Sequence, residues 1–436
     1  AREPVGVPAP APSPSGGAAP TSDAIPRRAL QSARVLRLTL VACIAPATMA
    51  TRVRIASYNV LSSHLASPDH FVRCDPANLD AKTRLLRVLR LLHEETSAGS
   101  VIALQEVSLD WSGELHTFFA QQGYHFVTAL YGHPFNNYMG VGLAWPTARF
   151  ETVAVECKRI SDTRAWPREA EQRRRGDQHG GGSGLLAGTL KVVGKVVGFP
   201  VTLVRSGVAL LLGGGGAKPP PPRFGGGFEG DPLPEARSRH NRAIAALLRP
   251  TAGGKAFAVG CYHMPCLFKT NTDKQVMVLH TSMYAQWLQR FAQARGKQAL
   301  GTCAPHVMCG DYNFVPTSPS YQLITGTGPP ADHPERPPPK APGDKTPFQW
   351  ECLPQGPMRS AYAEALGSEP EFTNNAWVGE GPAFRETLDY IFLSSEWRVN
   401  GVRPVPSPAS IGEDVFYPSV DEPSDHVMIA TDLDLT

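Results

Sequence analysis

The sequence predicts an α/β fold in which a mixed β-sheet sandwich carries helices on its outer faces and loops at one edge build a cleft. Short strand-like segments alternate with longer helical ones through most of the chain, and strand after strand leads into a polar motif. Hydrophobic residues make up 42% and charged residues 19% of the chain, which is typical of a globular protein.

In the first part of the chain, helices are predicted over 79–95 and 111–122. In the former, Leu85, Leu86, Leu89 and Leu92 recur at helical spacing. Strands are predicted from period-two alternation or short apolar runs at 53–60, 101–104, 124–130, 140–145 and 150–157.

In the second part, helices are predicted over 239–248 and from about 273 to 295. Strands are predicted at 256–262, 307–309, 387–393 and 427–433. Polar motifs at several of these strand ends include Gly310-Asp311-Tyr312-Asn313 and Ser424-Asp425-His426.

The predicted organisation is a single domain over 51–436, preceded by a tail or targeting segment over 1–50. Glycine and proline, 41 and 42 residues, concentrate in that tail and in insertions at 169–231 and 326–347. Arginines before the apolar run 38–50 resemble a signal or transit peptide, whereas Met49 is also a plausible start directly before the first strand. The location is expected to be intracellular, in the cytoplasm or in an organelle such as a mitochondrion or plastid.

The first insertion contains an apolar stretch over 185–212 with only Lys191, Lys195 and Arg205 charged. Glycines and Pro200 interrupt it, which favours a surface loop packed partly on itself. The alternative is a hairpin that makes weak contact with a membrane, its cations meeting lipid headgroups.

Charge and cysteine content set further limits. The net charge of +3 is too small to indicate nucleic-acid binding by itself, although a local basic face remains compatible with it. The eight cysteines form no CxxC pair and no regular spacing, which argues against a zinc ribbon or a disulfide framework and favours reduced thiols.

The polar strand ends contain the groups that phosphodiester hydrolysis requires. Hard oxygen ligands suit magnesium, and a nearby carboxylate or imidazole can deprotonate water and stabilise developing charge. Each motif alone is weak, because Gly, Asp and Asn favour turns anyway and an Asp-His pair is usually a surface pair. Their ordered occurrence carries the hypothesis; the residues concerned are Asn59, Glu106, His263, Asp311, Asn313, Asp389, Asp425 and His426.

As an ordered set, these segments resemble the endonuclease/exonuclease/phosphatase superfamily from about residue 52 to the C-terminus. The resemblance implies a two-sheet α/β sandwich forming one catalytic domain, with long low-complexity insertions. It also implies a Mg²⁺ cofactor that Mn²⁺ can replace. The implied metal-site residues are Asn59, Glu106 and Asp425; the implied catalytic residues are His263, Asp311, Asn313, Asp389 and His426.

The resemblance also assigns roles. His263 would contact the scissile phosphate, Asp311 would orient or deprotonate the attacking water, and Asn313 would hold that water. Asp389 would support His426, which binds the phosphate. Two positions depart from the family pattern: Leu61 replaces an aspartate found in some nucleases, and the usual Thr-His-Leu is Tyr262-His263-Met264.

The stretches 358–362, 369–374 and 384–392 resemble the deadenylase, nocturnin and 2′,5′-phosphodiesterase branch. This favours hydrolysis of RNA 3′ ends or oligonucleotides, with single-stranded RNA as partner. Implied substrate contacts are Asn137, Tyr138, Phe372, Asn374 and Trp377, although Trp377 and Phe384 are as compatible with packing the loop down. The alternatives are a lipid or inositol phosphodiesterase, supported by 185–212, and a binding module without catalysis.

Overall fold

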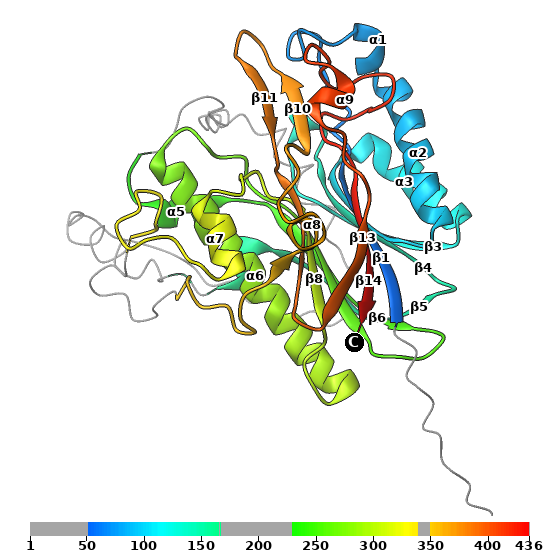
Figure 1. Cartoon of the computed structure of the whole chain (residues 1–436), viewed down its shortest axis with the longest axis vertical. Helices are drawn as coiled ribbons and strands as arrows, with labels where there is room; N and C mark the ends of the chain where they lie inside the picture. The colour runs from blue at the N-terminus through cyan, green and yellow to red at the C-terminus, as the bar shows by residue number, and fades with distance from the viewer. Residues whose placement is uncertain (1–50, 165, 167–228, 339–348, 436) are drawn as a thin grey trace, which may run out of the picture. The chain divides into compact units, whose positions relative to one another are not determined.

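The computed structural model describes residues 51–164, 166, 229–338 and 349–435. The predictions for the tail 1–50 and for the apolar stretch 185–212 therefore fall outside the described residues. Within them, the predicted α/β fold is confirmed as two mixed β-sheets with helices (Figure 1).

The first sheet has six strands. In spatial order they are β13 (Trp397–Val402), β14 (Ile429–Leu435), β1 (Thr51–Asn59), β2 (Val101–Val107), β4 (Gly140–Pro146) and β3 (Tyr124–Leu130). Only β1 and β2 run parallel to each other; the other neighbours are antiparallel.

The second sheet also has six strands. They are β5 (Phe150–Arg159), β6 (Arg242–Pro250), β7 (Phe257–His263), β8 (His306–Asp311), β12 (Asp389–Leu393) and β9 (Arg359–Ser360). Here β7 and β8 form the one parallel pair, with His263 aligned to Asp311. Each sheet thus contains two parallel strands whose carboxyl ends leave the sheet together.

The sheets pack face to face over a fully buried core drawn from both. It includes Ile55, Val101 and Leu143 of the first sheet and Val259 and Val307 of the second. Side chains alternate along a strand, so the opposite faces are free for helices. Helices α2 (Ala81–Ser97) and α3 (Leu109–Gln121) cover the first sheet, and α6 (Asn271–Leu300) covers the second (Figure 1).

The predicted helix at 239–248 is wrong, because Arg242–Pro250 is the strand β6 between β5 and β7. Ala243, Ala245 and Leu247 face the α6 layer, whereas Ile244 and Leu248 face the core between the sheets. A strand buried on both faces has no polar side, so its sequence shows neither alternation nor helical periodicity. Alanine favours a helix, but burial on both sheet faces overrides that propensity.

The predicted face of α2 also needs correction. The leucines at 85 and 89 are only partly buried and Leu86 is 63% exposed. The buried side of the helix carries Val88 and Leu92 together with the charged Arg84 and Glu95. The buried side of α2 is therefore partly charged, which the spacing of its leucines does not indicate.

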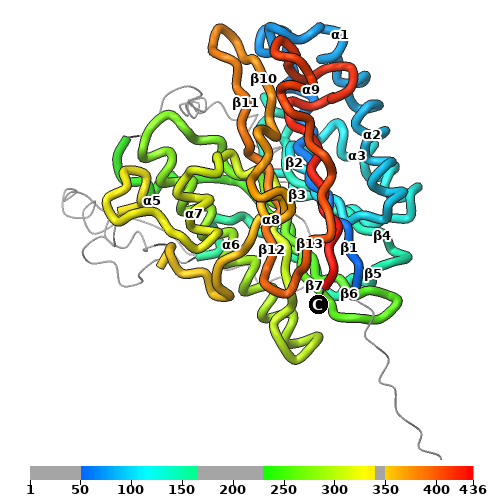
Figure 2. The backbone as a smooth tube through the Cα atoms, viewed as in Figure 1, coloured from blue at the N-terminus to red at the C-terminus, as the bar shows by residue number. Residues whose placement is uncertain are grey.

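Other elements were not predicted. The hairpin of β10 (Asn374–Trp377) and β11 (Ala383–Glu386) rises beside α9 (Pro408–Ile411) in the tube view (Figure 2). The remaining short helices are α1 (Pro76–Leu79), η1 (Pro134–Asn136), η2 (Ile160–Thr163), α5 (Pro232–Ser238), α7 (Pro319–Thr325) and α8 (Ala361–Leu366). Among the helices of the described ranges, none is long and apolar enough to span a membrane.

A buried histidine couples folding to pH. His280 of α6 is fully buried; its Nε2 faces the Ala236 carbonyl at 2.9 Å and its Nδ1 faces the Tyr262 hydroxyl at 2.9 Å. A carbonyl only accepts, so Nε2 donates to it and Nδ1 accepts from the hydroxyl, which satisfies the neutral ring. Burial lowers the pKa of His280 to about 4.

Acid should therefore weaken the fold through His280. The unfolded chain binds the proton near pH 6.5 and the folded chain only near pH 4, so stability falls as pH drops through this window, by about 3 kcal/mol in total. Urea unfolding at pH 7 and pH 4.5 should show a smaller acid loss in His280→Gln than in wild type. His93→Gln, at an exposed position, serves as the control. An unchanged acid loss in His280→Gln would contradict this assignment.

Candidate active site at the sheet edges

Polar side chains from both sheets meet at one edge of the sandwich. Four lie at the carboxyl ends of the parallel strands β1, β2, β7 and β8, and two precede or begin the antiparallel strands β14 and β12. Because antiparallel neighbours start where the parallel strands end, all six gather there. They are Asn59, Glu106, His263, Asp311, Asp389 and His426.

Glu106 reaches this edge through an irregularity in β2. Ile102 and Leu104 face α2 and α3, so regular alternation would also point residue 106 toward the helices. The register with β4 shifts between Leu104 and Val107, and Glu106 adopts a left-handed backbone with φ of 58°. Val107 takes the place under the helices and Glu106 turns toward Asn59 and His263, as bulges near functional sites commonly achieve.

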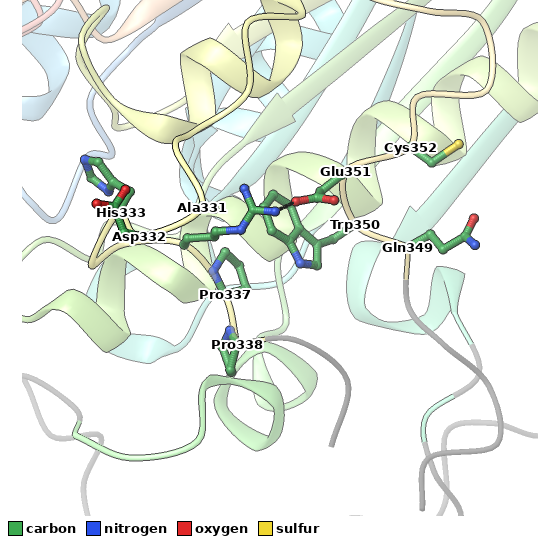
Figure 3. Close-up of a pocket in the computed structure, with 10 residues that line it drawn as sticks. Ala331, Asp332, His333, Pro337, Pro338, Gln349, Trp350, Glu351 and Cys352 are labelled. Carbon is green, nitrogen blue, oxygen red and sulfur yellow. Dashed lines mark hydrogen bonds and ion pairs between the residues drawn. The ribbon is translucent and has the colours of Figure 1, made fainter. Parts of the chain in front are cut away.

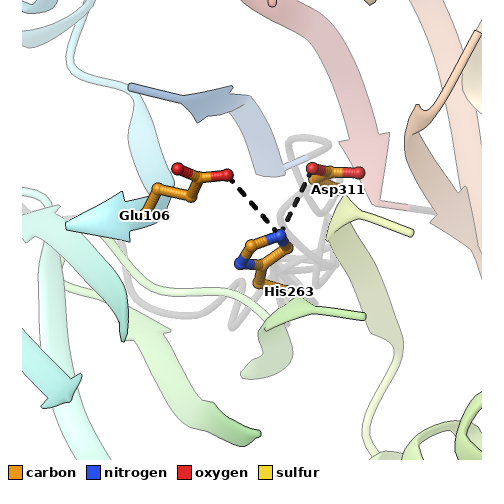
Figure 4. A group of neighbouring side chains, drawn as sticks. All are labelled: Glu106, His263 and Asp311. Atoms are coloured by element: carbon orange, nitrogen blue, oxygen red, sulfur yellow. Dashed lines mark ion pairs between the residues drawn. The ribbon is translucent and has the colours of Figure 1, made fainter. Parts of the chain in front are cut away.

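Asp311 lies at the centre of the cluster. Its Oδ2 accepts a hydrogen bond from Asn59 Nδ2 at 2.9 Å, which joins the two sheets. The same oxygen lies 3.5 Å from His263 Nε2 and 3.6 Å from His426 Nε2. Figure 4 shows Glu106 on the other side of His263, with Oε1 3.9 Å from Nε2.

Backbone close approach fixes where Asp311 points. Gly310, the preceding residue of β8, has φ of 154°, and a Cβ added to it would lie 2.0 Å from the Tyr262 carbonyl oxygen of β7. Only glycine allows this approach. The Oδ1 of Asp311 then accepts from the backbone N–H of Asn313 at 2.9 Å, while Asn313 Nδ2 donates to the Met264 carbonyl.

His426 and Asp389 form a buried pair. Their Nδ1 and Oδ2 lie 2.7 Å apart, and the hydroxyl of Thr373 donates to the same Oδ2 at 2.7 Å. Burial acts to lower the pKa of His426, but the carboxylates of Asp389 and Asp311 outweigh it and raise that pKa well above its usual value. Burial raises the pKa of Asp389 to about 6. Near neutral pH the pair is therefore an imidazolium and a carboxylate.

A buried guanidinium fixes the two loops that carry Asn59 and His426. Arg84 of α2 has no exposed surface and lies 5.0 Å from the ring centre of Trp111. It donates to the backbone carbonyls of Val60 (2.7 Å), Leu61 (2.5 Å), Ser62 (3.5 Å) and Pro423 (2.7 Å). Burial lowers the pKa of Arg84 to about 10, so it stays cationic at neutral pH.

The predicted substrate contacts Tyr138, Asn137 and Asn374 differ in their exposure and in their distance from the cluster. Tyr138 is 44% exposed and follows Asn137, whose Oδ1 accepts from the Asp110 backbone N–H. Asn374 lies at the cluster, where its Nδ2 donates to Asp425 Oδ2 at 3.3 Å.

The two aromatic residues predicted from the 369–377 region differ in their surroundings. Trp377 packs against Phe416 with Arg73 over its ring at 4.7 Å. Phe372 is fully buried against Tyr417 and Val427, so its ring offers no surface to a base, and the stacking role predicted for it needs correction.

The donor set fits a divalent cation. Two groups of side chains lie close enough together to hold a metal ion: Glu106 with His263 and Asp311, and Asp311 with Asp389 and His426. In the second group, Asp389 Oδ2 and His426 Nδ1 are already bonded to each other and are not available to a metal ion. In the first group, Glu106 and Asp311 both accept from Nδ2 of Asn59, which lies between them. Carboxylate and amide oxygens are hard ligands of the kind that Mg²⁺ prefers. Asp425 belongs to neither group.

A pocket elsewhere contains none of these residues. It has a volume of about 650 Å³ and is lined by residues 331–333, 336–338 and 349–352 (Figure 3). Arg336 stacks over Trp350 at 5.1 Å and pairs with Glu351. Among the described residues, its lining offers no acidic–histidine group comparable to the one at the sheet edge.

Fold and cluster together define a class of protein: a two-sheet α/β sandwich with an acidic and histidine centre at the sheet edge. The chain belongs to the endonuclease/exonuclease/phosphatase family, whose model matches residues 56–426.

The relatives found by sequence cover parts of the chain. It is similar to 2′,5′-phosphodiesterase 12 of Homo sapiens, 30% identical over 30% of this chain and 19% of the relative. It is 28% identical to the CCR4-Not complex 3′-5′-exoribonuclease subunit Ccr4 of Emericella nidulans over 37% of this chain and 26% of the relative. The chain thus matches less than a third of the length of either protein.

A solved structure shares the fold over most of the chain. ANGEL2, described as a 2′,3′-cyclic phosphatase, in complex with adenosine-2′,3′-vanadate, superposes with a TM-score of 0.58 and 17% identity. The superposition covers 88% of this chain and 96% of ANGEL2.

Several residues that build the site were not identified from the sequence. Arg84, Tyr131, Asn241 and Thr373 each lie outside the polar strand-end motifs. For Arg84 a signal existed, since it stands one helical turn before Val88 in the buried stripe of α2. For the other three, only the tertiary contacts reveal a role.

We expect Arg84→Met to destabilise the protein by about 3 kcal/mol or more, because it leaves several buried carbonyls without a donor. Urea unfolding measures the loss. Arg90→Met, at an exposed position of the same helix, is the matched control. Equal stability of the two variants would show that the guanidinium does not hold these loops.

Proposed function

We propose that this chain is a Mg²⁺-dependent phosphodiesterase that hydrolyses RNA at 3′ ends or short oligonucleotides, with single-stranded RNA as its partner. The observation that carries the proposal is the position of Asp311, whose Oδ2 accepts a hydrogen bond from Asn59 and lies 3.5 and 3.6 Å from Nε2 of His263 and His426, with Glu106 on the other side of His263. Membership of the family supports phosphoester hydrolysis. The phosphodiesterase for which one relative is named supports a phosphodiester substrate, and the 3′-5′-exoribonuclease for which another is named supports RNA.

The site residues divide the chemistry among them. Asn59 and Glu106 would hold Mg²⁺, with Asp425 beside it, and the ion supplies charge neutralisation on the phosphate when bound. Asp311 accepts the proton of the attacking water, and Asn313 orients that water. His426, as imidazolium, directs Nε2–H toward a non-bridging phosphate oxygen while Asp389 holds Nδ1. His263 contacts the same phosphate from the other side of Asp311.

The surface beside this centre suits a nucleic acid strand. Tyr138 presents an exposed ring, and the buried Oδ1 of Asn374 has no hydrogen-bond partner within the described part of the chain. Aromatic faces and amide groups are the usual means of binding unstacked bases. We therefore propose Tyr138, Asn137 and Asn374 as substrate contacts, with Trp377 at the margin.

The first test concerns metal and substrate together. A labelled oligo(A) should lose mononucleotides with Mg²⁺ or Mn²⁺ present and remain intact in chelator, because the acidic oxygens need a cation to accept an anionic substrate. Glu106→Gln should raise the Mg²⁺ concentration that gives half-maximal rate. Sphingomyelin run beside the RNA tests the lipid alternative: cleavage of the lipid but not of oligo(A) would refute the proposed substrate, and full activity in chelator would refute the metal.

The second test concerns catalysis. Asp311→Asn preserves shape but removes the base, so kcat should fall about a hundredfold or more with little change in thermal stability. His426→Ala should reduce kcat by a similar factor. Asp69→Asn, an exposed position, controls for the loss of a carboxylate. Near wild-type kcat in Asp311→Asn would rule out this assignment, and RNA binding without any turnover in wild type would favour a binding module.

A further inference from the structure

His263 is held by a hydrogen-bond chain that the proposed reaction does not by itself require. Asn241, just before β6, donates from Nδ2 to the backbone carbonyl of His263 at 2.9 Å. The same Nδ2 lies 3.3 Å from the hydroxyl of Tyr131. That hydroxyl lies 3.2 Å from Nδ1 of His263. Tyr131 follows the last residue of β3, so three strand ends from both sheets contribute to the chain.

The direction of every hydrogen bond in this chain follows from its first member. A backbone carbonyl only accepts, so the amide of Asn241 must turn its NH₂ group toward it. The second hydrogen of that NH₂ group then donates to the Tyr131 oxygen. The hydroxyl hydrogen of Tyr131 is left for Nδ1 of His263, which must accept.

The phenol is suited to be this donor. Burial, and to a lesser degree the charge of Glu106, raise the pKa of Tyr131 well above its ordinary value. The hydroxyl therefore keeps its hydrogen throughout the neutral range. An imidazole that accepts at Nδ1 carries its own hydrogen at Nε2 when neutral, and Nε2 is the atom that faces Asp311 and Glu106.

We propose that Tyr131, oriented by Asn241, is a positioning residue that selects the Nε2–H tautomer of the His263 imidazole. His263 is then a hydrogen-bond donor to a phosphate oxygen and not a metal ligand. The second half of this proposal rests on the proposed function; the tautomer itself does not. A nitrogen that carries hydrogen has no lone pair for a cation, so the metal is left to the oxygen ligands, as suits Mg²⁺.

The two histidines of the site thus receive opposite partners. His426 has a carboxylate at Nδ1, which stabilises the imidazolium, whereas His263 has a phenol, which does not. Both rings can then direct Nε2–H toward a phosphate oxygen, but only His426 has a carboxylate at Nδ1 that stabilises a positive charge on the ring.

The tautomer is measurable without metal or substrate. In ¹⁵N-histidine-labelled protein, the side-chain ¹⁵N–¹H correlation spectrum above the pH range of histidine titration distinguishes Nε2–H from Nδ1–H. His263→Gln identifies the His263 signals by their loss. Wild type should show the Nε2–H tautomer alone, and Tyr131→Phe should show a mixture of both. Tyr124→Phe, which removes a hydroxyl bonded to the Thr96 carbonyl, is the control and should keep the wild-type pattern.

Kinetics test the functional half. Tyr131→Phe should lower kcat about three- to tenfold with little change in the half-saturating Mg²⁺ concentration, the effect of one neutral hydrogen bond. An Nδ1–H tautomer in wild type, or an unchanged His263 spectrum in Tyr131→Phe, overturns the proposal. The expected spectra combined with no hydrolysis of RNA by wild type would leave the tautomer established and refute the proposed function instead.

Discussion

The hydrogen bond from Asn59 to Asp311 is the contact on which the site depends. It joins the end of β1 in one sheet to the end of β8 in the other, and both groups are buried. It forms only if the sheets pack at one spacing and one angle, which the shared core of β-branched residues, leucines and alanines sets. The packing of the apolar core therefore determines the distance between the polar groups Asn59 and Asp311.

Arg84 contributes a buried positive charge near the acidic cluster. Arg84 donates its hydrogen bonds to backbone carbonyls, and the more distant carboxylates of Asp425 and Glu106 stabilise its positive charge. That charge in turn offsets part of the repulsion between the carboxylates. The same four hydrogen bonds hold the chain after β1 against the chain before His426, so one side chain serves both geometry and electrostatics.

Much of the site is predictable because strand ends are local features. Asp311 follows a short apolar run, as Glu106 and His263 do, and the family resemblance assigns all three to one centre. The partners Tyr131, Asn241 and Thr373 are not predictable, since one polar residue in a loop carries no spacing signal. The error at β6 has the opposite cause, because a strand buried on both faces erases the alternation that identifies strands. Phe372 was predicted to contact substrate but is buried in a small core, because the sequence does not distinguish an aromatic residue of a binding loop from one of a core.

The hairpin of β10 and β11 is joined through its backbone to the segment that carries His426. Asn374 forms a β-bridge with His426, and the N–H of Asn375 donates to the Asp425 carbonyl. At the far end, Gly379 donates to the His70 carbonyl, which ties the hairpin to the chain after β1. The hairpin is therefore anchored at both ends to the segments that carry Asn59 and His426. Under the proposed function, a substrate bound at Asn374 would therefore contact a segment that backbone hydrogen bonds join directly to Asp425 and His426.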